Sequence, residues 1–233
     1  MALIVLFLAA LWAGVQNALA GGGSFVTLPA LMFTGMDVRA ANITSTIALF
    51  PAQIATAMTG RRLVTGAAGL SFRALVVISL AGGALGAILL LVTPPRFFAH
   101  LVPWLVLFAT IVFAWGSFGP KRAARAQLSR HGAAAAQFAI SIYGGYFGGG
   151  IGILMLAALS LLGLTDIHQM NGLKNFLALS INGVAIVTFG FAYRACGLEC
   201  LRNLVVQFHA VGPDHERPVS WNLSQHLLSE EHH

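Results

Sequence analysis

The sequence predicts an all-α polytopic membrane protein with an internal repeat and glycine-broken helices. Hydrophobic residues make up 58% of the 233 residues and charged residues only 9%, and the mean hydropathy is +0.82. A soluble domain carries about 25% charged residues, so lipid must cover much of this apolar chain. Apolar segments follow one another closely, and a Gly-Gly-Gly triplet occurs within two of them.

Short polar or proline-containing stretches separate six apolar segments. The second segment ends at Arg61 and Arg62, and the third ends before Pro94 and Pro95, which cannot continue a helix. Four of the segments have the length of a straight membrane span, about 20 residues. The segments cover residues 2–33, 41–60, 74–92, 97–115, 133–164 and 170–193.

The first and fifth segments are too long for one straight helix and too short for two full crossings. Each contains a glycine triplet, at 21–23 and at 148–150. Glycine weakens a helix by about 1 kcal/mol relative to alanine, so we expect each triplet to break or unwind its helix. Close packing of helices through small residues is the alternative explanation.

The two triplets belong to an internal repeat. They are 127 residues apart, and Asp37 and Asn42 have counterparts 129 residues further on, at Asp166 and Asn171. Interrupted helices at corresponding positions of two halves are typical of secondary transporters. When each long segment counts as one crossing, four spans lie between the two repeat starts. An even number predicts parallel repeats, the second of them truncated.

Basic residues predict the orientation of the chain. Arg61 and Arg62, and the basic stretch 121–130, each follow an even-numbered segment. Lys and Arg collect on the cytoplasmic side, so we expect both groups and the N-terminus there, in a multi-pass protein of the cytoplasmic (inner) membrane. Basic residues that fall between apolar segments do not form the continuous face that nucleic acid requires. The opposite side is expected to hold Asp37, Arg39, Arg96 and Asp166.

Three regions are expected along the chain. Residues 1–130 form the first transmembrane repeat with a basic cytoplasmic loop, residues 131–193 a partial second repeat, and residues 194–233 an atypical polar tail. The tail holds five of the eight histidines, in a spacing that matches no metal site. Its composition favours a disordered or frameshifted segment over a packed domain.

A solute site is expected where the two breaks face each other. A broken helix exposes backbone N–H groups at an N-terminus, which act as about half a positive charge and attract a small anion. Nearby polar side chains can add hydrogen bonds, although each Ser or Thr hydroxyl can instead bond to its own helix. The candidate binding residues are Gly21, Gly22, Gly23, Ser24, Asn42, Thr44, Ser45, Thr46, Gly148, Gly149, Gly150, Asn171, Lys174 and Asn175.

Lys174 is the sharpest single candidate. It lies near the start of the sixth segment, with Asn171 and Asn175 beside it at helical spacing. A buried ammonium in a membrane is costly and marks a pathway or an ion pair. The alternative is a lysine whose amine reaches the membrane interface.

Enzyme motifs are absent from the sequence. Ser24 follows three glycines, but the glycine that an intramembrane serine protease needs after its serine is missing. The sequence has no His-Glu-x-x-His and no phosphate-binding lysine motif. Cys196 and Cys200 are too few for a recognisable metal site. We therefore expect neither enzymatic activity nor a cofactor.

Three stretches resemble the TauE/SafE family of sulfite and organoanion exporters. Residues 21–29 resemble its first glycine-rich motif, and Gly-Gly-Gly-Ile-Gly at 148–152 resembles its second. Residues 166–175, which end in Met-Asn-Gly-Leu-Lys-Asn, resemble a segment of its second half. The resemblance covers about residues 1–193. It implies an eight-span permease for sulfite, sulfoacetate or a similar small anion, without an ATP-binding module.

Two functions from different classes follow. The first is a permease that moves a small anion (sulfite, a sulfonate or a similar organic anion) across the membrane. Its partners are lipid and the anion, and a coupling proton or sodium ion is left open. The second is a truncated, non-functional permease or a membrane scaffold, because the sequence after Tyr193 is polar where the family has its last two spans. The oligomeric state is left open.

Overall fold

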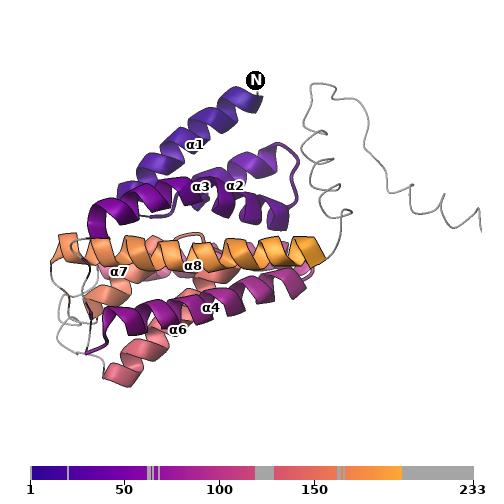
Figure 1. Ribbon diagram of the computed structural model, residues 1–233. Coiled ribbons are helices and arrows are strands. Elements are labelled where there is room, and N and C mark those ends of the chain that lie inside the picture. The colour runs from indigo at the N-terminus through magenta and orange to yellow at the C-terminus, as the bar shows by residue number, and fades with distance from the viewer. Residues whose placement is uncertain are drawn as a thin grey trace, which may run out of the picture.

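The computed structural model of the chain is a bundle of helices (Figure 1). It describes residues 2–19, 21–61, 64, 66–67, 69–118, 129–161, 164 and 166–195. Within these ranges there are eight α-helices and no strand, apart from one isolated bridge between Ala67 and Leu70, and the all-α prediction is confirmed. The helices are α1 (Ala2–Leu19), α2 (Ser24–Phe33), α3 (Val38–Gly60), α4 (Phe72–Val92), α5 (Pro95–Phe118), α6 (Arg130–Tyr146), α7 (Ile151–Leu161) and α8 (Ile167–Ala195).

The starts of the longer helices follow from their local sequence. Asp37 caps α3 by accepting hydrogen bonds from two backbone N–H groups of the first turn, and Ser71 and Ser129 cap α4 and α6 in the same way with one bond each. Short polar side chains are preferred there because they satisfy N–H groups that the helix leaves free. α5 begins at Pro95, where the missing N–H of proline is no loss.

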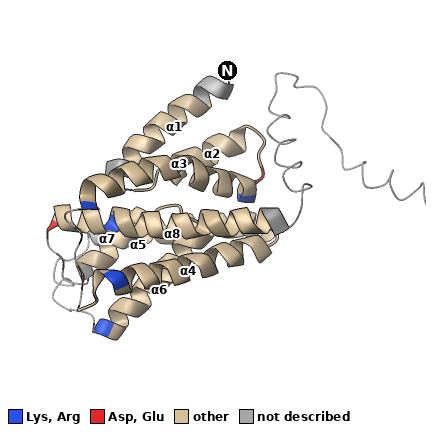
Figure 2. Ribbon diagram, viewed as in Figure 1, with Lys and Arg blue, Asp and Glu red and all other residues tan. Residues whose placement is uncertain are grey.

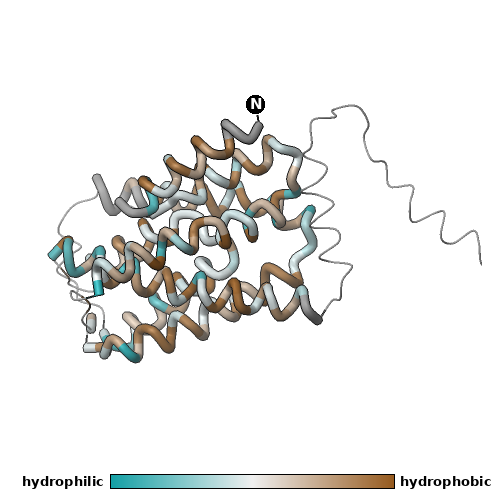
Figure 3. Tube along the Cα trace, turned by 45° about the horizontal axis from the view of Figure 1, so that its top comes forward, coloured by the Kyte–Doolittle hydropathy of each residue, from teal (hydrophilic) through white to brown (hydrophobic). Residues whose placement is uncertain are grey.

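The outer surface of the bundle is apolar. Among the described residues, three helices, α4, α5 and α8, are long and apolar enough to cross a membrane. Large apolar side chains point outward from them: Trp104 is 71% exposed and Phe191 is 70% exposed. Figure 3 shows many hydrophobic residues along the helices, with hydrophilic residues at several of their ends. An apolar surface of this extent requires lipid around it.

Both glycine triplets lie between helices. Residues 21–23 separate α1 from α2, and residues 148–150 separate α6 from α7. Gly21 and Gly148 have φ values of 81° and 73°, in the left-handed region that glycine adopts without steric cost.

The chain folds back on itself at each break. Gly23 is the last residue before α2. A Cβ on Gly23 would lie 2.5 Å from the carbonyl oxygen of Ala13 in α1. After the second break, Ile151 of α7 packs against Gly144 of α6. Each broken segment is therefore a long helix followed by a short helix that returns along it, as Figure 1 shows for α1 and α2.

The order of long helix, break, short helix and long helix occurs twice, in α1–α3 and in α6–α8. The two copies run in opposite directions. Gly60, at the end of α3, touches Gly172 near the start of α8, while Gln53, earlier in α3, bonds to Asn182, later in α8. The two helices are therefore antiparallel. The expected parallel relation is therefore not what the helices show. Each break reverses the chain, so five helices precede the second copy instead of four spans, and an odd number inverts it.

Charged residues lie at the two ends of the bundle (Figure 2). α4 and α6 run in the same direction, since Gly82 and Gly86 of α4 meet Ser141 and Tyr146 of α6 in turn. Arg130, which starts α6, therefore lies at the end of the bundle where Arg61 follows α3 and α4 begins, whereas Asp37 and Arg39 lie at the other end, where Arg39 bonds to Thr93 after α4. Asp166 caps the start of α8, which lies beside the end of α3. It is therefore at the Arg61 end, and the expectation that it lies opposite Arg61 is wrong for the same reason as the parallel repeat.

The N-terminal helix starts from the Asp37 end of the bundle (Figure 1). Arg130 starts α6 at the other end. The expectation that the N-terminus and the basic stretch 121–130 share one side therefore does not fit the position of Arg130, the described end of that stretch.

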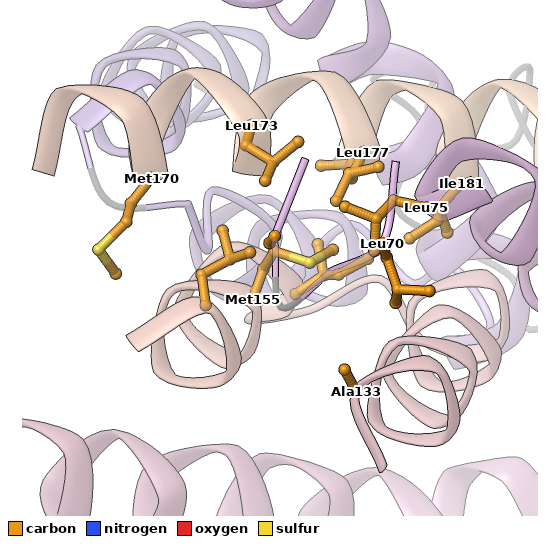
Figure 4. Close-up of a cluster of buried hydrophobic side chains, with 12 residues drawn as sticks. Leu70, Leu75, Ala133, Met155, Met170, Leu173, Leu177 and Ile181 are labelled. Carbon is orange, nitrogen blue, oxygen red and sulfur yellow. The ribbon is translucent and has the colours of Figure 1, made fainter. Parts of the chain in front are cut away.

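Glycines bring α4 and α6 into close contact. A Cβ on Gly82 would lie 2.6 Å from the Cβ of Ser141, a separation that no real side chain tolerates. In membranes, where packing and not hydrophobicity drives helix association, small residues permit such crossings. A cluster of buried apolar side chains, including Leu75, Met155 and Leu173, joins α4 to α7 and α8 beside this contact (Figure 4).

Two predictions concern residues outside the described ranges. The polar tail falls almost wholly within 196–233, and most of the basic loop falls within 119–128. The division of the chain into 1–130, 131–193 and 194–233 therefore stays a prediction.

Candidate functional site

A small cavity lies where the first break meets α7 and α8. The two broken segments touch there through their backbones, since a Cβ on Gly21 would lie 2.6 Å from the Cα of Gly152. In this conformation the cavity has room for about one water molecule, so a larger solute requires it to widen. The cavity is lined by Asn17, Gly21, Gln53, Thr56, Ile151, Gly152, Lys174, Asn175 and Ala178.

Lys174 is buried in the wall of this cavity. Its side chain is 1% exposed, and its Nζ has no hydrogen-bond partner among the residues that the structure describes. The carboxylates within residues 1–193 are Asp37 and Asp166, and both cap helix starts. A charged residue at the centre of a membrane helix costs about 2.5–3.5 kcal/mol. The snorkelling explanation requires an amine that reaches the interface, and this burial does not fit it.

The start of α7 also faces the cavity. Ile151 and Gly152 are the first residues of this 11-residue helix, and both line the cavity wall. The N–H groups of a first helical turn have no partner within their own helix and carry the positive end of the helix dipole. Together with the ammonium of Lys174 they make this wall electropositive, which suits an anion. The side-chain amides of Asn17 and Asn175 can donate further hydrogen bonds.

A hydrogen bond between α3 and α8 borders the cavity. Asn182 Nδ2 donates to Gln53 Oε1 over 2.9 Å, and both side chains are buried. Gln53 and Thr56 are lining residues that the sequence reasoning missed. A signal for Gln53 was present, because it precedes Asn182 by 129 residues, the same offset that relates Asn42 to Asn171.

A second polar cluster lies against the second break. The amide of Asn42 donates through Nδ2 to the carbonyl oxygen of Tyr146 over 3.3 Å, and Thr46 Oγ1 is 3.5 Å from where a Cβ of Gly148 would lie. The long helix of each copy thus presents its polar residues to the break of the other copy. The predicted site residues are therefore divided between two places.

The other predicted site residues have mixed surroundings. The buried hydroxyl of Ser45 pairs with that of Thr27 over 2.5 Å, while Ser24 and Thr44 are half-buried. Asn171 lies one turn before Lys174, and its Oδ1 lacks a partner in the described part of the chain. The predicted residues that do not line the cavity are Gly22, Gly23, Ser24, Asn42, Thr44, Ser45, Thr46, Gly148, Gly149, Gly150 and Asn171.

Comparison with known proteins points to a membrane transporter family. The family model described as "Sulfite exporter TauE/SafE" matches residues 6–211. A curated relative, the "Probable membrane transporter protein" of Haemophilus influenzae, is 31% identical over 168 residues, which cover 69% of this chain. The chain spans 64% of the length of that relative. No solved structure matches the chain significantly.

The family match begins in α1 and extends beyond α8. It includes both breaks and Lys174. The resemblance of the chain to this family is thereby confirmed, and the chain belongs to the TauE/SafE sulfite exporter family.

Proposed function

We propose that the chain moves a small anion across the cytoplasmic membrane and binds it in the cavity beside Lys174. The observation that carries this proposal is the buried ammonium without a partner among the described residues. A fixed charge inside a membrane protein is stabilised when an opposite charge reaches it. An anion in the cavity would meet this ammonium and the N-terminus of α7 together.

The proposed substrate class is sulfite or a small sulfonate. These oxyanions offer several acceptor oxygens, which match the ammonium, the helix N–H groups and the amides around the cavity. The description of the family points to sulfite export, and the name of the relative points to membrane transport. Because the chain matches only part of that relative's length, transport by this chain is itself part of the proposal.

The proposed orientation follows from the charges at the two ends of the bundle. Arg61, Arg73 and Arg130 lie at one end, against Arg39 and Arg96 at the other. Lys and Arg concentrate on the cytoplasmic side, so the Arg61 end faces the cytoplasm. The first helix then starts from the outer side of the membrane, in place of the cytoplasmic N-terminus expected from the sequence.

Sulfite flux into proteoliposomes that contain the purified chain tests this function. Replacing Lys174 with Met removes the charge and keeps much of the volume, so we expect anion affinity to fall. A hydrogen bond to a charged group contributes about 1.5–3 kcal/mol, which corresponds to roughly a tenfold to hundredfold loss of affinity. Lys174→Arg should retain part of the flux because it keeps the charge.

The control is Thr188→Ala, because this hydroxyl bonds only within its own helix. It should leave flux and reconstituted amount unchanged. Unaltered affinity in Lys174→Met, at an equal amount of folded protein, would contradict the role of Lys174. Absence of sulfite, sulfonate and related anion flux in the folded wild-type chain would instead favour a membrane scaffold or inactive permease.

A further inference from the structure

The polar cluster at the second break is formed by Asn42 and Thr46 of α3 and by the backbone from Tyr146 to Gly150. Asn42 is 2% exposed and Thr46 is 8% exposed. Asn42 Nδ2 is engaged by the carbonyl oxygen of Tyr146, but its Oδ1 has no partner within the described part of the chain. The second cluster thus contains a buried acceptor without a partner, whereas the cavity contains a buried donor without one, the Nζ of Lys174. An acceptor calls for a cation or a hydrogen-bond donor.

The helix end at this cluster has the polarity that a cation requires. Tyr146 is the last residue of α6, and the last carbonyl groups of a helix carry the negative end of its dipole. The carbonyl of Gly150 already accepts bonds from Ile153 and Leu154, and that of Gly149 accepts one from the hydroxyl of Tyr143. A carbonyl oxygen has two lone pairs. Those of Tyr146 and Gly149 each accept one side-chain hydrogen bond and can still contact a cation beside the amide oxygen of Asn42, whereas that of Gly150 already accepts two.

The composition of the cluster selects the kind of cation. Its oxygens come from an amide, a hydroxyl and backbone carbonyls, ligands that suit hard cations. No carboxylate belongs to it, and the described residues contain no group of three or more His, Cys, Asp or Glu, so the charge of a divalent ion would not be balanced. The cluster also has no group that titrates near neutral pH, which disfavours a bound proton.

The nearby cation Arg39 does not occupy the cluster. Arg39, one turn before Asn42 on α3, donates through Nη1 to the carbonyl oxygens of Leu91 and Thr93. Its guanidinium is therefore directed to the end of α4. The hydroxyl of Tyr146 likewise donates to the side chain of Thr93, which turns its ring away from a role as a ligand.

We propose that Asn42, Thr46 and the backbone of the second break bind a sodium ion. The helix C-terminus at this break then binds the cation. The helix N-terminus at the cavity of Lys174 binds the anion. Unwound backbone and helix C-terminal ends hold coupling cations in transporters with inverted repeats. Binding of sodium stands independently of the anion site; its use as the coupling ion rests on the proposed function.

The test measures thermal unfolding of the purified full chain in detergent, followed by tryptophan fluorescence. NaCl, KCl and choline chloride are compared at equal concentration, so the anion is the same in every arm. Sodium well above its Kd should raise the Tm of the wild type by about 3 °C over choline. Thr188→Ala and Lys174→Met should keep this rise, because neither residue belongs to the cluster.

Asn42→Ala and Thr46→Val should lose the sodium-specific rise, and Asn42→Asp should enlarge it because a carboxylate attracts the ion more strongly. If Asn42→Ala does not fold, the sodium-specific rise in Tm of Thr46→Val and of Asn42→Asp decides the proposal. An equal rise in KCl or choline chloride, an unchanged rise in both alanine and valine variants, or no rise in any variant would overturn the proposal. Loss of the rise in Lys174→Met would also overturn it, by placing the sodium effect at the anion cavity.

Discussion

At the scale of single residues, the proposed anion cavity depends on one charge and on one absent side chain. Lys174 provides the charge, and Gly21 provides the space, since its backbone approaches that of Gly152 too closely for a Cβ. The candidacy of Lys174 could be predicted from the sequence, because lysine is rare among apolar residues. The surroundings of Lys174 could not be predicted, because the backbone at Gly21 that shares its cavity lies more than 150 residues earlier in the chain. Only the packing of the helices brings the two together.

The role of Gly21 can be separated from its backbone conformation by comparison with Gly35. Both have positive φ, 81° and 86°, but only Gly21 has a close neighbour, whereas nothing lies within 4 Å of a Cβ on Gly35. Alanine at either position should incur a left-handed strain of about 1–2 kcal/mol. Gly21→Ala should add a steric cost of about 1–3 kcal/mol and unfold at a lower temperature than Gly35→Ala. Equal melting temperatures of the two variants in detergent would contradict the close contact.

At the scale of elements, the paired helices α4 and α6 hold the short helix α7 in place. They cross where Gly82 and Gly86 of α4 meet the backbone of α6, and the apolar cluster of Figure 4 connects this crossing to α7 and α8. The sequence predicted the positions of α4 and α6 from hydrophobicity. It did not predict their contact, because small residues permit a close approach without specifying the partner helix.

Gly86→Ala tests this crossing, with Gly190→Ala as its matched control. A Cβ on Gly86 would collide with the carbonyl oxygen of Ile142, whereas one on Gly190 in α8 would have no neighbour within 4 Å. We expect Gly86→Ala to destabilise the protein by about 1–3 kcal/mol through overpacking. Gly190→Ala should be neutral or slightly stabilising, because alanine favours a helix. The measurement is the unfolding temperature in detergent; a stable Gly86→Ala variant would show that α4 and α6 do not approach this closely.

At the scale of the whole molecule, the inverted arrangement places each break against the other copy's long helix. The apolar segments and both breaks followed from composition and glycine cost, which are local properties. The relative direction of the two copies did not follow from these local properties. A glycine triplet shows where a helix stops, but the contacts of Gly23 with Ala13 and of Ile151 with Gly144 decide where the chain goes next. Counting each broken segment as one crossing predicts parallel copies, whereas the chain reverses at each break, so the copies are inverted and Asp166 lies at the Arg61 end.

Single cysteines can distinguish these arrangements in intact cells. In a background with Cys196→Ser and Cys200→Ser, we expect Pro94→Cys to react with an impermeant maleimide from outside, because Pro94 is exposed at the end that holds Arg39. Cysteine at Ala124, in the basic loop that the sequence predicts to be cytoplasmic, or at Asp166 should react only after the membrane is permeabilised, since we propose from the Lys and Arg content that the Arg61 end faces the cytoplasm.

Asp166 is the decisive position. Parallel repeats would expose it on the same side as Pro94, whereas the antiparallel packing of α3 and α8 puts it at the end that holds Arg61. Labelling of both Pro94→Cys and Asp166→Cys from outside would therefore contradict the inverted arrangement. Labelling of Ala124→Cys and Asp166→Cys, with Pro94→Cys protected, would keep the inversion but reverse the proposed orientation, and with it the side of the membrane from which the anion reaches Lys174.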